Sequence, residues 1–278
     1  MATWRAVARV LRSSADCVIS ATLPGDCRLC ELSLDGASRL PVCRTCLEQL
    51  IATSAAQSSS NAQFCSCCAT RLDAGSFSAR QDGLCEECRA TPPPFAGVVA
   101  SGQYDGTLRQ LIHLLKFERV TSVAALLAER MAEALDGALL QTQAPLLITA
   151  VPLFSRKQSE RGFNQSRLLA QELVTALRRR GWDVRGDYAL LLRKRETRSQ
   201  SELNLSQRRA NLRGVFGAGK NAAMIRDANI LLIDDIVTTT ATARQCSAVL
   251  VKAGAAQVWV ATAARSQKVE VAGWGTPQ

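Results

Sequence analysis

The 278-residue sequence predicts an α/β protein, with a parallel, doubly wound sheet preceded by a small cysteine-rich module. After residue 96, β-prone runs alternate with amphipathic segments, which is typical of parallel βαβ units. Before it, eight of the eleven cysteines form four Cys-x2-Cys pairs. Between the two parts stands Thr91-Pro92-Pro93-Pro94-Phe95, and polyproline continues neither a helix nor a central strand. We therefore expect two domains, residues 1–95 and 96–278.

Composition and cysteine usage narrow the class of protein. A chain that is 47% hydrophobic and 21% charged is typical of a globular protein, and no apolar run approaches the roughly 18 residues that span a bilayer. Residues 1–17 carry Arg5, Arg9 and Arg12 among their apolar residues, which predicts an amphipathic helix rather than a secretory signal. Many cysteines without an export signal indicate a reducing compartment, so we expect a cytoplasmic protein.

The four cysteine pairs have the spacing of metal knuckles. They are Cys27/Cys30, Cys43/Cys46, Cys65/Cys68 and Cys85/Cys88. Two such knuckles present four thiolates, the ligand set of a structural zinc site without an open catalytic position. Residues 52–62 are small or polar and lack an apolar period, so we expect metal to organise this segment. The sequence predicts two structural Zn²⁺ ions, with redox-active or free thiols as the alternative.

The grouping of the pairs is open at this stage. Sequential grouping, first with second and third with fourth, is expected, although interleaved grouping would have the same spacings. Cys67 offers a third thiol beside Cys68 but lacks the x2 spacing. Cys17 and Cys246 lie outside the pattern and are expected to be small buried residues.

The first elements of the second domain are a strand at 97–104 and a helix at 107–117. Leu108, Leu111, Ile112 and Leu115 form one helical face, and His113 and Lys116 fall off that face. We therefore expect His113 to be a surface or packing residue. The remaining expected elements are helices at 122–139, 165–180 and 242–253, and strands at 146–151, 229–234 and 257–263.

The segment after the strand at 229–234 carries the clearest functional signal. Asp234 and Asp235 are followed by Thr238-Thr239-Thr240-Ala241-Thr242 at the start of a helix. Helix N-termini bind phosphate, and two carboxylates accept hydrogen bonds from ribose hydroxyls. A threonine-rich cap alone would leave the two adjacent acids unexplained, so the segment predicts a ribose 5-phosphate site.

The basic charge is concentrated in one segment. Residues 156–213 hold fifteen Lys or Arg against six Asp or Glu, within a chain of net charge +10. Such a field favours a polyphosphate or a nucleic acid, with a solvated basic face as the alternative. Aromatic residues for base stacking are few in the region, namely Phe154, Phe163, Trp182, Tyr188 and Phe216.

The acid-threonine segment resembles the phosphoribosyl pyrophosphate motif of type I phosphoribosyltransferases. Together with Arg161-Gly162-Phe163-Asn164-Gln165 and the cysteine pairs, it resembles the ComF/ComFC/GntX family of competence-associated proteins, over about residues 27–264. The resemblance implies a phosphoribosyltransferase-type sheet, a double zinc ribbon, and Mg²⁺ bound with phosphoribosyl pyrophosphate.

The resemblance also implies site residues. Asp234, Asp235 and Arg161 would be catalytic. The 5-phosphate would lie on Val237, Thr238, Thr239, Thr240, Ala241 and Thr242, and the pyrophosphate on Pro152, Arg156, Lys157, Arg161, Gly162 and Asn164. A mobile hood, 193–214, would contribute Arg195, Arg198, Gln200, Arg208, Arg209 and Asn211.

One residue departs from the family pattern. The family has glycine where this chain has Thr240. Glycine there either adopts φ > 0 or lets the phosphate approach the backbone, and a β-branched residue does both poorly. The left-handed conformation alone costs a non-glycine residue about 1–2 kcal/mol.

The expected function is binding of phosphoribosyl pyrophosphate in competence and DNA uptake, with internalised single-stranded DNA and competence-machinery proteins as partners. The alternatives are an active transferase on an unidentified acceptor and a nucleotide-precursor sensor without catalysis.

Overall fold

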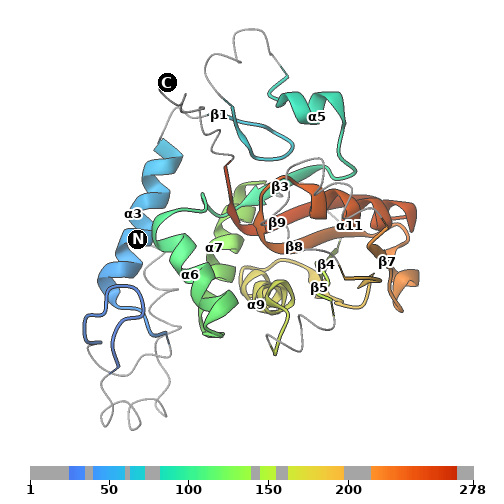
Figure 1. The fold of residues 1–278 in the computed structure, drawn as a ribbon. Helices are drawn as coiled ribbons and strands as arrows, with labels where there is room; N and C mark the ends of the chain where they lie inside the picture. Colours follow the sequence, from blue (N-terminus) through green and yellow to red (C-terminus); the bar gives the residue numbers. More distant parts are fainter. Residues whose placement is uncertain are drawn as a thin grey trace, which may run out of the picture.

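The centre of the molecule is a five-stranded parallel sheet (Figure 1). The computed structural model describes residues 25–34, 40–59, 63–72, 82–138, 145–154, 162–196 and 214–267, so the helix expected at 1–17 lies outside them. The strands, in the order β3-β9-β8-β4-β5, are β3 Gly97–Ala100, β9 Gln257–Arg265, β8 Asn229–Val237, β4 Leu146–Ala150 and β5 Val184–Gly186. The predicted parallel sheet is confirmed.

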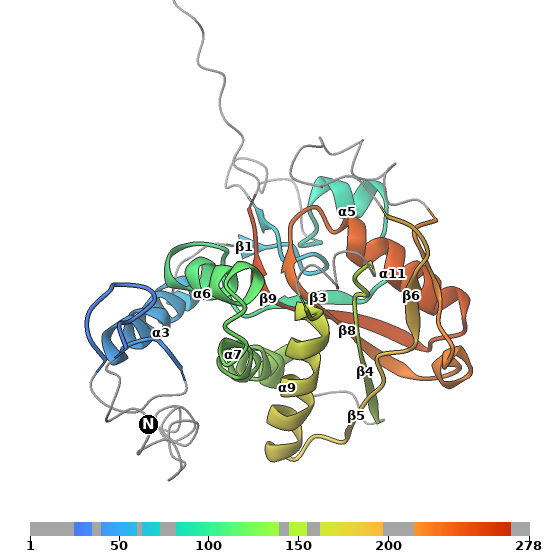
Figure 2. The same cartoon turned by 60° about the horizontal axis from the view of Figure 1, so that its bottom comes forward.

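Helices cover both faces of this sheet, as Figure 2 shows. One face carries α6 Gly106–Phe117, α7 Val123–Ala138 and α9 Gln165–Arg179, and the other carries α11 Ala241–Lys252. The side chains of β8 alternate accordingly: Leu231 and Ile233 join the core of the first face, and Ile230 and Leu232 join the core that contains Leu250 of α11. The fold is therefore doubly wound, as the alternating pattern predicts.

β8 is longer than the sequence indicates. It continues through both acids to Val237, because β9 also extends and pairs Ile236 with Ala264 and Val237 with Arg265. Asp234 and Asp235 consequently lie within the last strand positions and not in a loop after the strand. The backbone that carries them is held by a neighbouring strand on one side.

The first cysteine segment packs on the sheet domain through α3 Arg44–Ser59. Residues 52–62 lack an apolar period, and the sequence therefore did not indicate a helix there; α3 nevertheless continues to Ser59. Its first two turns contribute the buried residues Leu47 and Leu50, which lie in the same core as Leu111 of α6. Packing of these first turns therefore stabilises the helix, although the residues after them have no apolar period.

The second cysteine segment lies at a different place on the domain, beside β3 and α11 (Figure 1). It comprises the hairpin β1 Gln63–Phe64 and β2 Arg71–Leu72, and the short helix α5 Glu86–Ala90. The N–H of Val98 in β3 donates to the carbonyl of Cys67 at 2.9 Å. A boundary at residue 95 stays a prediction, since both cysteine segments contact the sheet domain.

Three smaller elements follow the main sheet strands β4 and β5 in the chain. β6 Leu191–Arg193 pairs antiparallel with β7 Phe216–Ala218, and a short 3₁₀ helix, η2, covers Ala222–Ile225. Within the described ranges, the helices are all too short or too polar to cross a bilayer.

Candidate ligand site and metal centres

β4 and β8 are neighbours at the point where the chain changes face. After β4 it passes to α9 on one face, and after β8 it passes to α11 on the other. In doubly wound sheets, the two diverging loops at such a point leave the crevice in which ligands bind. The two segments singled out by the sequence, after β4 and at the end of β8, therefore meet at the same sheet edge.

The acid pair of β8 is held by side chains from two helices. Asp234 Oδ1 accepts hydrogen bonds from Ser166 Oγ of α9 at 3.0 Å and from the N–H of Asp235 at 2.9 Å. Asp235 Oδ2 lies 2.9 Å from Lys116 Nζ of α6, and its Oδ1 accepts from the N–H of Ile236 at 2.7 Å. Only 6% of the Asp235 side chain and 16% of the Lys116 side chain are exposed, so this ion pair is largely shielded from water.

Burial and the neighbouring Asp235 carboxylate raise the pKa of Asp234 to about 7, although Lys116 and Ser166 act in the opposite direction. Near neutral pH Asp234 is therefore partly protonated. A bound cation would favour the fully ionised form.

The threonine segment connects β8 to α11. Thr238 is exposed, Thr239 and Thr240 are buried, and Ala241 and Thr242 form the first turn of the helix. Thr240 is the N-cap and has φ 57° and ψ 0°, so this position adopts the left-handed conformation, the first of the two reasons for glycine in the family. Its Oγ1 accepts a hydrogen bond from Arg244 Nε at 3.1 Å.

The loop after β4 is tied at both ends by Asn164. Its Nδ2 donates to the carbonyl of Val151 at 3.0 Å, and its Oδ1 accepts from the N–H of Arg167 and so caps α9. Pro152 lies in the described start of the loop, and Gly162 has φ 83° near its end. The remaining predicted pyrophosphate residues lie outside the described part of the chain: Arg156, Lys157 and Arg161.

The predicted hood begins and ends on paired strands. Arg193 of β6 is in register with Phe216 of β7, and its guanidinium lies 5.6 Å from that ring. Arg195 follows β6 and is exposed. The other hood residues lie outside the described ranges: Arg198, Gln200, Arg208, Arg209 and Asn211.

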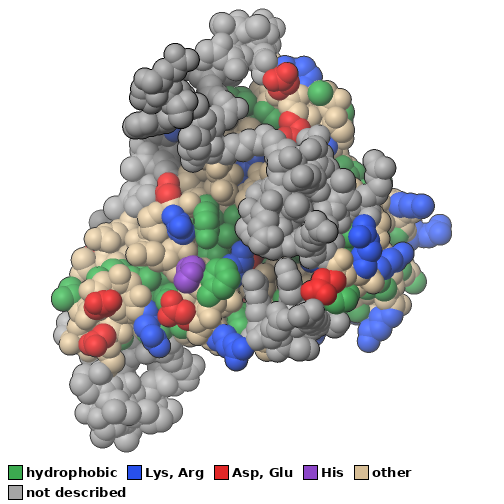
Figure 3. All heavy atoms as spheres, viewed as in Figure 1, with side chains coloured by type: hydrophobic (Ala, Val, Ile, Leu, Met, Phe, Trp, Pro, Cys, Tyr) green, Lys and Arg blue, Asp and Glu red, His purple; other side chains and the backbone are tan. Residues whose placement is uncertain are grey.

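Part of the basic excess of residues 156–213 is structural. Arg179, the last residue of α9, and its C-cap Arg180 pair with Glu129 of α7, and Arg180 also pairs with Asp136. On the face in Figure 3, basic side chains are interspersed with acidic ones and gather most toward the edge near β7. Among the aromatic residues expected to stack on bases, Phe216 is only 5% exposed and therefore does not present its ring.

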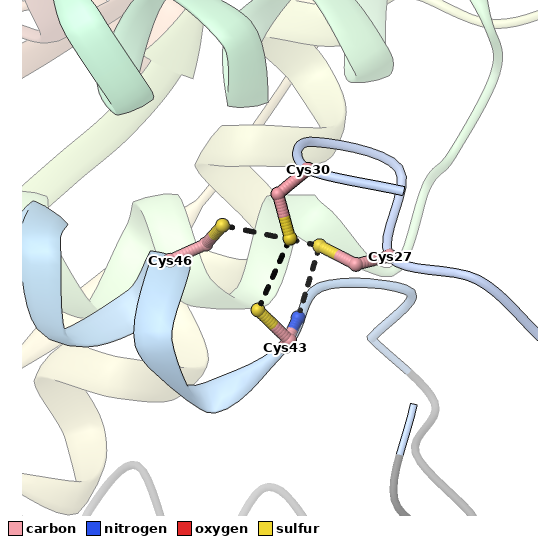
Figure 4. A group of neighbouring side chains, drawn as sticks. All are labelled: Cys27, Cys30, Cys43 and Cys46. Atoms are coloured by element: carbon pink, nitrogen blue, oxygen red, sulfur yellow. Dashed lines mark hydrogen bonds between the residues drawn. The ribbon is translucent and has the colours of Figure 1, made fainter. Parts of the chain in front are cut away.

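The first cysteine group brings four sulfur atoms together (Figure 4). Cys27, Cys30, Cys43 and Cys46 place their Sγ atoms within 4.8 Å of one another. Burial raises the pKa of Cys27, but N–H donors that include Cys43 lower it to about 6, which favours a thiolate. The group could hold one metal ion.

The second group consists of Cys65, Cys68, Cys85 and Cys88, also within 4.8 Å. The structure thus confirms the sequential grouping and leaves Cys67 outside it. Two arginines approach these sulfurs: Arg244 Nη2 lies 3.8 Å from Cys88 Sγ, and Arg265 Nη2 lies 4.0 Å from Cys68 Sγ. Arg265 is 5% exposed and its Nε and Nη1 have no partner among the described residues, so an anionic group is needed beside it. Four thiolates around a divalent ion carry two negative charges and fit this environment.

Three residues of this region were not predicted as part of the sites: Lys116, Ser166 and Arg244. Ser166 directly follows the Gly-Phe-Asn-Gln segment, so its position in the sequence could have indicated a role at the site. The sequence did not indicate such a role for Lys116 or Arg244, because their contacts with distant residues depend on how α6 and α11 pack.

Comparison with known proteins identifies relatives over most of the chain. The "DNA utilization protein YhgH" of Salmonella typhi is 33% identical over 242 residues, which cover 86% of this chain and 96% of that protein. Its Escherichia coli (strain K12) counterpart is 34% identical over 179 residues, 63% of this chain and 75% of that protein. "Competence protein F" of Haemophilus influenzae is 29% identical over 184 residues, 66% of this chain and 78% of that protein.

Solved structures give more distant likenesses. The "allosteric regulatory enzyme of purine biosynthesis" matches with a TM-score of 0.35 and 18% identity, over 55% of this chain and 30% of that chain. "HGPRT-ase from Leishmania tarentolae in complex with GMP" matches with a TM-score of 0.30 and 14% identity, over 59% and 72%. No family model matches the chain. On the extent of its identity to the Salmonella relative and its similarity to Competence protein F, the chain belongs to the ComF family.

Proposed function

We propose that this protein binds phosphoribosyl pyrophosphate at the β4/β8 edge of its sheet and serves DNA utilisation. The observation that carries the proposal is the acid pair near the end of β8, followed after a short threonine segment by a left-handed N-cap at Thr240 and the twelve-residue helix α11. A helix N-terminus attracts the 5-phosphate through its N–H groups and dipole. The two acids precede this N-cap in the chain, within β8, and ribose hydroxyls of the same ligand would reach them there.

Mg²⁺ fits the chemistry of the acid pair. Asp234 and Asp235 are the residues that would hold the ion together with the ligand, since Mg²⁺ is bound through one or two carboxylates plus phosphate oxygens. When bound, it neutralises pyrophosphate charge. Lys116 supplies a positive charge to Asp235 when the cation is absent, and thereby keeps two adjacent acids in a largely buried place.

The residues support binding more directly than turnover. Displacement at the anomeric carbon of the ribose expels pyrophosphate, so a transferase needs cations on the leaving group and a closed hood that excludes water. Arg156, Lys157 and Arg161 are the cations that the sequence provides for the first task. We therefore propose binding of phosphoribosyl pyrophosphate as the primary function, with transfer of the phosphoribosyl group to an acceptor as the alternative.

Isothermal calorimetry tests whether the protein binds phosphoribosyl pyrophosphate. The zinc-loaded protein is titrated with phosphoribosyl pyrophosphate in MgCl₂, and with ribose 5-phosphate and inorganic phosphate separately. Asp235→Asn should weaken binding of the pyrophosphate ligand by about tenfold or more. Asp105→Asn, an exposed N-cap on α6, is the matched control and should bind like wild type. Equal affinities for all three proteins would contradict the site.

A pyrophosphate-release assay separates binding from transfer. It is run against a panel of nucleobases and amines, with and without single-stranded DNA. Release that disappears in Asp235→Asn makes the protein a transferase. Binding without release for any acceptor makes it a ligand sensor.

Handling of single-stranded DNA is the second part of the proposal. It is supported by the relatives' names and by one exposed aromatic pair on α6: Phe117 is 60% exposed, and its ring centroid lies 4.6 Å from that of His113. Phe117 ends α6, the helix that also carries Lys116, so bases stacked on this ring would lie at the end of α6.

We also propose that both cysteine groups hold structural Zn²⁺, because tetrahedral four-thiolate sites prefer that ion.

A further inference from the structure

Arg244 connects the second cysteine group to the threonine segment. It lies one turn into α11, and 12% of its side chain is exposed. Nε donates to Thr240 Oγ1 at 3.1 Å, Nη1 donates to the carbonyl of Thr91 at 2.8 Å, and Nη2 lies 3.8 Å from Cys88 Sγ. One guanidinium therefore touches the N-cap of α11, the chain after α5, and a sulfur of the group.

This placement is electrostatically unfavourable for the helix alone. The first turn of a helix carries a partial positive charge, so a cation there is repelled unless an anion lies close. The nearby anions are Glu87, whose Oε1 lies 4.0 Å from Nε, and the cysteine group itself. A four-thiolate group with a divalent ion has a net charge of −2, which compensates both Arg244 and the neighbouring Arg265.

The contact with Thr240 acts on the strained residue of the segment. A β-branched residue reaches the left-handed region only when its surroundings hold it there. Arg244 holds the hydroxyl from the side of the cysteine group. The rigid planar guanidinium suits this task, because several donors are held in fixed directions.

We propose that Arg244 is a positioning residue through which the second cysteine group holds Thr240 left-handed and thereby keeps the segment Thr238 to Thr242 ready for a phosphate. The inference rests on the proposed phosphate site and adds a way in which its affinity is set. Through Arg244, the intact second cysteine group raises the affinity of the threonine segment for phosphate. The group consists of Cys65, Cys68, Cys85 and Cys88. The first cysteine group packs against α6 and has no comparable connection among the described contacts.

Two measurements test the proposal. One is calorimetry with ribose 5-phosphate, and the other is hydrogen exchange of the peptide amides at 237–244 without ligand. Arg244→Gln should weaken ribose 5-phosphate by about tenfold and accelerate exchange of these amides. Lys252→Gln, at the far end of the same helix, is the control and should change neither.

A double-mutant cycle distinguishes positioning from simple charge attraction. Glycine adopts the left-handed conformation unaided, so in a Thr240→Gly background Arg244→Gln should change affinity by less than about twofold. An equally large loss in both backgrounds would overturn the proposal, because Arg244 would then act on the phosphate directly. If Arg244→Gln does not fold, Thr240→Ala replaces it, since alanine keeps the conformational cost and loses the hydroxyl.

The cysteine group is tested separately. Cys85→Ser should accelerate exchange at 237–244 as Arg244→Gln does, whereas Cys67→Ser should not. Unchanged exchange in Cys85→Ser, with metal lost from the group, would overturn the link. Should wild type not bind ribose 5-phosphate while exchange responds as expected, the proposed function fails and the link stands.

Discussion

Lys116 Nζ lies 2.9 Å from Asp235 Oδ2 and joins α6 to the end of β8. The positive charge of Lys116 compensates the buried Asp235 carboxylate, which explains how the strand accommodates two adjacent acids that are largely shielded from water. Asp234 shares in the arrangement, because Lys116 opposes the rise of its pKa. The helix that the sequence identifies by its apolar face thus also contributes, from its other side, a cation to the candidate site.

Removal of this cation should destabilise the protein in a pH-dependent way. Lys116→Gln is expected to lower the free energy of unfolding by about 2 kcal/mol or more at pH 8, since an unpaired buried carboxylate remains. At pH 5.5 the loss should be smaller, because Asp234 then carries a proton and does not repel Asp235. Urea denaturation at both pH values measures this, with His113→Gln, an exposed residue of the same helix, as control. Equal losses at the two pH values would argue against the pairing.

The raised pKa of Asp234 makes a second prediction about pH. The folded protein keeps this proton up to about pH 7, whereas the unfolded chain releases it near pH 4. Its contribution to the unfolding free energy should therefore decrease as pH rises from about 4 to 7 and be level above 7. The decrease should be absent in Asp234→Asn and present in Asp105→Asn. A pH profile of Asp234→Asn that parallels wild type would place the titration elsewhere.

Thr240→Gly should tighten binding of phosphoribosyl pyrophosphate by up to about tenfold, since glycine has no cost at φ 57° and lets the phosphate approach the backbone. Thr240→Ala should bind more weakly than wild type, because it retains the cost without the hydrogen bond from Arg244. Calorimetry in MgCl₂ compares the three proteins. Unchanged affinity in the glycine variant would mean that Arg244 already offsets the whole cost.

The cysteine groups predict metal content and stability. Wild type should contain two Zn²⁺ per chain, Cys46→Ser one, and Cys67→Ser two, as measured by atomic emission. Cys46 is buried in the core shared with α6 and α7, so its replacement should lower the Tm of the whole chain by roughly 10 °C or more. A local change with an unaltered main transition would show that the first group does not support the sheet domain.

Phe117→Ala tests the proposed contact with single-stranded DNA. Loss of one stacked base should weaken binding by about tenfold, as measured by fluorescence anisotropy with an oligothymidylate. The slope of affinity against salt concentration should stay the same, because no charge changes. Phe64→Ala is the control, since Phe64 is also exposed but belongs to β1 in the second cysteine segment. Equal weakening in both variants would remove Phe117 from the proposed site.

The local signals of the sequence were reliable where neighbours in the chain are neighbours in space. The apolar face of α6, the extent of α9, the cysteine knuckles and the left-handed conformation at Thr240 are all properties of short stretches of sequence. The end of β8 was predicted too early, because the strand is prolonged by pairing with β9, a segment some twenty residues away. The helix over residues 52–59 was missed for a similar reason, since its anchor is a core built with α6.

The sequence by itself determined the parallel doubly wound sheet, the two sets of four cysteines and the segment from Asp234 to Thr242. Periodicity, ligand spacing and conformational preference are written into adjacent residues. Only the tertiary structure decided that Lys116 neutralises Asp235 and that Arg244 joins Cys88 to Thr240. The contacts of Lys116 with Asp235 and of Arg244 with Cys88 each span over 100 residues of chain. These side chains meet their partners only after the sheet has set the positions of the helices that carry them.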